Sequence, residues 1–181
     1  MAAGKSSRFR EAGAGHKLLA TVQGKAIIEH SLQNACDSGM DVFVTTRPED
    51  MHLHPLMRHV RTVTCASSGL GESIAAAVQA SAQYDGWLIS LADLPLLKAE
   101  SFIVAARALR TSPLVRMEVN GRCGHPVGFE RSFYSSLISL RGDNGPRTLL
   151  GTSSLTRIST TDIGCIEDID TVQDLARLQS R

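Results

Sequence analysis

The N-terminal residues combine small side chains, hydroxyls and cations in an order suited to binding an anion. A turn built around Gly4 lets a ligand approach backbone N–H groups closely, and Arg8 and Lys17 add positive charge. We therefore expect a triphosphate site. Its expected residues are Ala2, Ala3, Gly4, Lys5, Ser6 and Ser7, with positive charge from Lys5, Arg8 and Lys17.

The same stretch has other interpretations. Small residues with scattered cations also occur in ordinary surface loops. The tripeptide at 4–6 lacks the upstream glycine of a P-loop, and no third glycine stands at the spacing of a dinucleotide-binding fingerprint. The loop alone therefore does not decide between a ligand site and a connecting segment.

A carboxylate follows a largely apolar predicted strand. Residues 87–91 read WLISL, a run typical of a strand covered on both faces, and Asp93 and Pro95 come shortly after it. A carboxylate at the end of a central strand, next to phosphate oxygens, suits Mg²⁺, which takes few protein ligands. The alternative is that Asp93 caps the following turn.

Two later segments also carry groups able to do chemistry. Residues 121–129 combine glycines with His125, and residues 142–147 place Asp143 and Arg147 around a predicted helix start. Each segment has a structural explanation, the first as a hairpin and the second as a capped turn. Their coincidence with the N-terminal loop and Asp93 favours one shared site.

Alternating helices and apolar strands must position these residues. Helices are predicted at 27–35, 73–83, 99–109, 131–140, 146–150 and from 171 onward, and strands at 42–44, 87–91, 114–119, 126–129 and 155–159. Asn120 and Gly121 favour a hairpin turn. The order indicates a three-layer Rossmann-like α/β fold with a mostly parallel sheet, where ligands bind beyond the carboxyl ends of the strands.

Composition limits the classes of function. A chain of 181 residues with 43% hydrophobic and 20% charged residues can bury one core, so a single domain over 1–181 is expected. The net charge of +1 provides no field for a nucleic acid or an anionic membrane surface. Four cysteines far apart, without a secretory signal, favour a reducing cytoplasm.

Three histidines, His52, His54 and His59, lie close together in the sequence. They occupy a polar, proline-containing stretch that reads as a loop or a short surface helix. Because this stretch shows no carboxylate or cysteine partners at ligand spacing, we expect a structural or adventitious role rather than a metal site.

The glycine-rich loop should follow a first, central strand, yet only Met1 precedes Ala2. We therefore expect either a start upstream of Met1 or a missing strand. A missing strand leaves a gap in the sheet and affects the geometry of the loop.

Taken together, the motifs resemble those of the MobA-like nucleotidyltransferases, and within them the molybdenum cofactor cytidylyltransferases and their relatives. The matching motifs are AAGKSSRF at 2–9 with KLL at 17–19, GLGESIAAAV at 69–78, LADLP at 91–95, GHPVGF at 124–129, GDNGPRTLL at 142–150 and DIDTVQDL at 168–175. Their order and spacing cover almost the whole chain.

The resemblance implies transfer of a cytidylyl group from CTP to the terminal phosphate of molybdopterin, with release of pyrophosphate. Lys17 and Arg8 are implied to neutralise the phosphates, and Asp93 to hold Mg²⁺. Asp170 is implied as a second metal ligand, although it also stands where a helix cap is expected. The implied nucleotide contacts also include Gly69, Gly71 and Ser73, and the implied acceptor contacts are His125, Asp143 and Arg147.

The resemblance leaves alternatives for base and acceptor. Ala3 before Gly4 resembles the cytidine-selective loops of the family, whereas guanylyl-selective relatives tend to carry a second glycine there. The alternative enzymes transfer a guanylyl group to molybdopterin or make a CDP-alcohol or a sugar nucleotide on the same fold. The alternative outside catalysis is a protein that holds the molybdenum cofactor or a molybdenum hydroxylase apoprotein.

Overall fold

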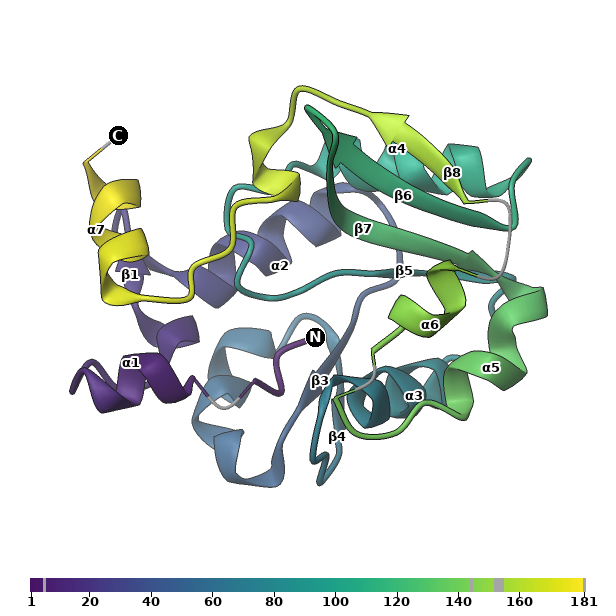
Figure 1. Cartoon of the computed structure of the whole chain (residues 1–181). Helices are drawn as coiled ribbons and strands as arrows, with labels where there is room; N and C mark the ends of the chain where they lie inside the picture. The colour runs from purple at the N-terminus through teal and green to yellow at the C-terminus, as the bar shows by residue number, and fades with distance from the viewer. Residues whose placement is uncertain (5, 144, 152–154, 181) are drawn as a thin grey trace.

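A computed structural model describes residues 1–4, 6–143, 145–151 and 155–180 (Figure 1). The α-helices and 3₁₀-helices, the latter labelled η, are α1 (Ser7–Glu11), η1 (Lys17–Leu19), α2 (Ile27–Asp37), η2 (Pro48–Met57), α3 (Leu70–Ala80), α4 (Ala99–Leu109), η3 (Arg131–Phe133), α5 (Tyr134–Ile138), α6 (Arg147–Leu150), η4 (Ile163–Cys165) and α7 (Val172–Gln179). The strands are β1 (Thr21–Val22), β2 (Lys25–Ala26), β3 (Phe43–Thr46), β4 (Arg61–Thr64), β5 (Gly86–Ile89), β6 (Leu114–Val119), β7 (Arg122–Glu130) and β8 (Thr156–Ser159).

The larger sheet has the strand order β5-β7-β6-β8. In this sheet β7 runs antiparallel to both of its neighbours, β5 and β6, while β8 runs parallel to β6. Strands β3 and β4 form a separate parallel pair, and β1 and β2 form a short antiparallel pair. The expected α/β fold is confirmed, and its larger sheet combines antiparallel and parallel pairings.

The β6–β7 hairpin turns at Asn120 and Gly121, as their sequence favours. Their φ angles of 49° and 78° lie in the left-handed region, which a two-residue hairpin turn requires at both central positions. This hairpin is one of the two antiparallel pairings in the larger sheet, and the pairing of β7 with β5 is the other.

Helices cover both faces of the larger sheet, which gives the three layers (Figure 1). On one face Trp87 and Ile89 of β5 pack with Ile74 of α3. On the other face Val115 of β6 packs with Phe102 of α4. Burial of each such side chain contributes about 1.5–3 kcal/mol to folding.

A further core lies under the N-terminal segment. Phe9 of α1 and Leu18 of η1 are buried with Ile28 of α2 and Leu53 of η2. Their relative exposures are 3% or less, so the segment that carries the predicted triphosphate loop is anchored by apolar packing. The same core sets η1 against η2.

Met1 and Ala2 lie between the ends of β3 and β5. The amino group of Met1 donates to the carbonyl oxygen of Ser90 at 2.8 Å, and the N–H of Ala92 donates to the Met1 carbonyl at 3.0 Å. On the other side, the N–H of Ala2 donates to the Thr45 carbonyl at 2.9 Å. In the described residues no strand extends these hydrogen bonds of Met1 and Ala2. A largely apolar cavity of about 470 Å³ lies between β3 and β5.

Element types agree with the sequence patterns better than their ends do. Helix α3 begins at Leu70, ahead of the predicted residue 73, because the Glu72 carboxylate accepts hydrogen bonds from the N–H groups of Ser68 and Gly69. The predicted helix at 131–140 divides into η3 and α5. Helix α7 begins after Thr171 in the capping box with Asp174 that the sequence indicates.

None of the helices in the described part of the chain is long and apolar enough to cross a membrane.

Candidate nucleotide-binding site

A cavity of about 300 Å³ lies where the N-terminal loop meets the end of β5. One side is formed by residues 1–4 and the other by residues 67–70 together with Ser73. Lys17, Asp93 and Asp143 complete its polar lining. The cavity therefore brings together predicted residues from four separate sequence motifs, namely Ala2, Ala3, Gly4, Lys17, Gly69, Ser73, Asp93 and Asp143.

Lys17 forms the centre of the charged groups at this cavity. Its Nζ atom donates to the carboxylate of Asp93, and donates to Oδ1 of Asp170 at 2.8 Å. Arg8 donates to the other oxygen of Asp170, Oδ2, at 2.6 Å. The predicted groups thus form a chain of two cations and two carboxylates, of which Lys17 and Asp93 are mostly buried.

Charge pairing decides the protonation of Lys17. Burial lowers the pKa of its ammonium, but the carboxylates of Asp93 and Asp170 outweigh burial and raise the pKa above its ordinary value. Lys17 is therefore a fixed cation at neutral pH, suited to neutralising phosphate charge rather than to taking up a proton.

Asp93 has one carboxylate oxygen without a hydrogen-bond partner within the described structure. Oδ2 accepts from Lys17, whereas Oδ1 is buried and has no hydrogen-bond partner there. A buried carboxylate oxygen without a partner is costly and is suited to a hard cation. Asp93 therefore does not act as a simple turn cap.

Asp170 lies on the same ion-pair network, and another residue caps the helix that follows it. The N-cap of α7 is Thr171, whose hydroxyl accepts from the N–H of Asp174. Burial raises the pKa of Asp170, but hydrogen bonds and charge from Lys17 and Arg8 outweigh it and lower the pKa. Asp170 thus remains an anion beside Asp93.

Local sequence explains how Lys17 reaches this position. Gly13 and Gly15 have φ angles of 72° and 74°, a region that glycine adopts at little cost, and they end the segment after α1. The imidazole of His16 then accepts from the N–H of Leu18 and caps η1. Because Leu18 is buried, η1 is held in place with Lys17 facing the cavity.

The opposite wall depends on a close approach between two glycine-containing segments. A Cβ atom on Gly69 would lie 2.3 Å from the carbonyl carbon of Gly142, so only glycine fits there. The N–H of Gly71 donates to the Gly142 carbonyl at 2.8 Å. This contact places Asp143 at the cavity, whereas Gly71, an expected nucleotide contact, is not part of the cavity lining.

Other predicted nucleotide contacts lie outside the cavity lining. Ser6 has a left-handed φ of 51°, and its buried hydroxyl has no hydrogen-bond partner in the described structure. Ser7 is exposed at the start of α1. Lys5 lies outside the described residues.

The acceptor residues are less tightly grouped. Asp143 lines the cavity, whereas His125 contacts the Ile89 carbonyl through Nδ1 at 3.3 Å. Burial lowers the pKa of His125 and favours its neutral form. Arg147 is exposed at the start of α6 and is not part of the cavity lining.

Two serines in the lining were not predicted from the sequence. Ser67 and Ser68 lie at the cavity, and the hydroxyls of Ser67 and Ser73 are 2.7 Å apart. Their position directly before the GLGES motif could have indicated this role, because the first backbone N–H groups of a helix have no partner within the helix. Burial, followed by the charges of Asp170 and Asp93, raises the pKa of Asp168, the first residue of the DIDTVQDL motif.

The fold is that of the nucleotidyltransferases. The family model for the MobA-like NTP transferase domain matches residues 1–158, and the chain belongs to this family. The membership agrees with the resemblance carried by the sequence motifs. A search of curated proteins found no match.

Solved structures share the fold. Rv0371c from Mycobacterium tuberculosis H37Rv superposes with a TM-score of 0.88 and 21% identity, covering 99% of this chain and 95% of that one. A nucleotidyl transferase from Methanothermobacter thermautotroptrophicus, Mth528, gives 0.81 and 22%, covering 99% and 93%. Molybdopterin-guanine dinucleotide biosynthesis protein A from Archaeoglobus fulgidus gives 0.75 and 15%, covering 99% and 94%.

Proposed function

We propose that this nucleotidyltransferase moves a cytidylyl group from CTP to the terminal phosphate of molybdopterin. The observation that supports it best is the single cavity that joins the loop at 2–4 to Lys17 and Asp93. In the reaction, an oxygen of the acceptor phosphate forms a bond to the α-phosphorus of CTP. The bond from that phosphorus to the β-phosphate oxygen breaks, and pyrophosphate leaves.

The triphosphate would bind along the N-terminal loop. A Cβ atom on Gly4 would meet no atom of the described residues within 4 Å, so their packing does not require glycine there. We attribute the glycine at this position to the close approach of the ligand, which a side chain would obstruct. Lys17 and Arg8 then neutralise charge on the phosphates, which helps most as negative charge builds on the leaving pyrophosphate.

The residues at the end of β5 fit a divalent ion. Asp93 offers the unpartnered oxygen Oδ1, and Asp170 is an anion on the same ammonium group. When bound there, Mg²⁺ supplies further charge neutralisation to the phosphates. One neighbour in fold, Rv0371c, has been solved as a complex with manganese, with a TM-score of 0.80 and 20% identity over 98% of this chain and 94% of that one.

Residues around the cavity would select base and acceptor. The Ala3 methyl narrows the wall of the cavity, in keeping with a pyrimidine rather than a purine. Ser73 and Gly69 lie on the facing wall. We assign the acceptor to the side of Asp143, with His125 and Arg147 reaching it from outside the present lining.

Pyrophosphate release with purified molybdopterin, Mg²⁺ and each of CTP, GTP and UTP tests the proposal. We expect turnover with CTP, and a loss of at least about 10²-fold in Asp93→Asn, because that change removes charge at the reacting phosphates. Asp85→Asn is the matched control, an exposed carboxylate in the turn before β5.

Three results would change the assignment. Preference for GTP would make the enzyme a guanylyl transferase. Turnover with an alcohol or sugar phosphate in place of molybdopterin would move it to another branch of the fold. Binding of molybdopterin without any pyrophosphate release would favour a carrier protein, a function that could include delivery to a molybdenum hydroxylase apoprotein.

A further inference from the structure

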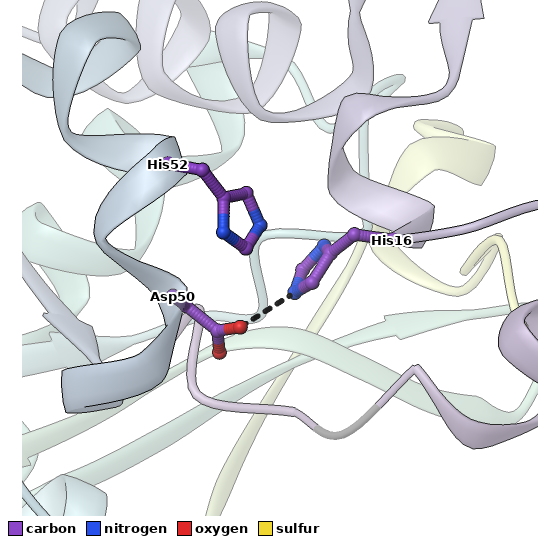
Figure 2. A group of neighbouring side chains, drawn as sticks. All are labelled: His16, Asp50 and His52. Atoms are coloured by element: carbon purple, nitrogen blue, oxygen red, sulfur yellow. Dashed lines mark ion pairs between the residues drawn. The ribbon is translucent and has the colours of Figure 1, made fainter.

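His16, Asp50 and His52 form a cluster apart from the groups that meet at Lys17 (Figure 2). His16 comes from the segment before η1, and the other two come from η2. One potential ligand atom from each residue lies within 4.8 Å of the other two. The rings of His16 and His52 meet edge to face, with centroids 5.3 Å apart.

Asp50 is the unusual member of this cluster. Its side chain is 0% exposed, and neither carboxylate oxygen has a hydrogen-bond partner in the described structure. The basic groups nearest to it are Arg10 at 3.5 Å and His16 Nε2 at 3.6 Å, both beyond ordinary hydrogen-bond length. A buried carboxylate in this state is costly unless a cation completes its surroundings.

The local backbone directs Asp50 inward. Pro48 starts η2, and the helix is interrupted at Asp50, where φ is −95° and ψ is 29°. The interruption separates the buried carboxylate from exposed His52, only two residues later. Asp50 is therefore fixed in the interior, while the side chain of His52 can approach the same point from the solvent side.

We propose that His16, Asp50 and His52 bind one zinc ion. Two imidazole nitrogens and one carboxylate oxygen are a donor set that Zn²⁺ accepts, with water as the fourth ligand. Zinc bonds of about 2.0–2.1 Å in a tetrahedron place ligand atoms about 3.3 Å apart. The separation of 3.6 Å between His16 Nε2 and Asp50 Oδ1 is close to this value. The side chain of His52 is exposed and can turn toward the other two ligands.

Two existing contacts must change when the ion binds. The side chain of Arg10 is half exposed, so it can turn into solvent and leave Asp50 to the metal. Ligation through His16 Nε2 puts the ring proton on Nδ1, which ends the 3.3 Å hydrogen bond from the N–H of Leu18. η1 starts at Lys17, directly after His16. The bond from His16 to the metal would then replace the N-cap hydrogen bond in fixing the start of η1.

Zinc titration of the whole chain against a chromogenic chelator tests the site, with Co²⁺ absorption reporting tetrahedral geometry. The test background is Asp93→Asn combined with Asp170→Asn, which removes the carboxylates assigned to the transfer reaction. We expect one zinc per chain in this background. Adding His52→Ala should weaken zinc binding at least about ten-fold. Loss of a residue that only hydrogen-bonds to a metal ligand already costs about this much in affinity.

His59→Ala is the matched control, because His59 is an exposed histidine from the same stretch of chain. It should bind zinc as the background does, and Arg10→Gln should bind more tightly because a competing cation is gone. Zinc should also raise the Tm of every variant except those carrying His52→Ala. Absence of zinc binding in the background, or equal binding with His52→Ala, overturns the proposal without touching the assigned transferase activity.

Discussion

The Nζ atom of Lys17 and the Oδ1 atom of Asp170 lie 2.8 Å apart although 153 positions separate the two residues in the sequence. This contact joins the first loop of the chain to the segment that leads into its last helix. Asp93 approaches the same ammonium group from the end of β5. Three regions of the chain therefore share one cation.

Lys17→Met should abolish most of the transferase activity. The variant keeps the apolar stem but removes the charge that would neutralise the phosphates, so we expect kcat/KM to fall about 10²- to 10³-fold. Steady-state pyrophosphate release measures this effect. Lys25→Met, at an exposed position in β2, is the matched control, and equal losses in both variants would contradict the role of Lys17.

Ala3→Gly should weaken the preference for CTP over GTP. Removing one methyl from the cavity wall widens the space for a purine, and such steric differences are worth about 1–3 kcal/mol. The ratio of kcat/KM for the two nucleotides gives the change. A ratio unaltered within error would assign base choice to another part of the cavity.

Two glycine substitutions should separate folding from ligand binding. Gly69→Ala forces a Cβ atom against Gly142 and should lower the free energy of unfolding by about 1–3 kcal/mol. The Cβ atom of Gly4→Ala would lie within 4 Å of no atom in the described part of the chain, so stability should change by no more than about 0.5 kcal/mol while CTP affinity falls. Denaturant unfolding and nucleotide titration measure the two effects, and unchanged CTP affinity in Gly4→Ala would argue against phosphate binding at the loop.

The stabilising contacts of Asp170 should disappear in acid. Its pKa is lowered in the folded state, so its contribution is present above about pH 4, the range where the unfolded residue ionises, and is lost as pH falls through the folded pKa. Asp170→Asn should therefore be less stable than the parent at pH 7, and the difference should shrink below pH 4. Parallel stability curves from pH 7 to pH 3 would contradict this linkage.

Much of the fold could be predicted because its main elements carry clear patterns. Helix α4 spans the predicted residues 99–109, and β6 spans the predicted 114–119. Strand β4 was not predicted, because RTVT is short and mostly exposed and lacks a buried face. Helix α1 was also not predicted, since it begins without a side-chain cap inside a glycine-rich segment.

The candidate site was predictable in its residue types and less so in its contacts. Motif order pointed to Lys17, Asp93 and Asp170, but only folding shows that one ammonium joins both carboxylates. The Asp50 cluster was not predicted at all. No carboxylate partner was expected for the histidines, although Asp50 stands two positions before His52 in η2. The distant His16 reaches these two residues only through folding, which no local spacing indicates.

The ion pair between Lys17 and Asp170 also bears on how far this protein can be shortened. The family model ends at residue 158, and Asp170 lies beyond it. An expression fragment cut at that boundary would retain the lysine, which is only 12% exposed, with one of its two counter-charges missing. The residues after the matched domain therefore contribute to the charge balance around Lys17, and a shortened clone should retain them.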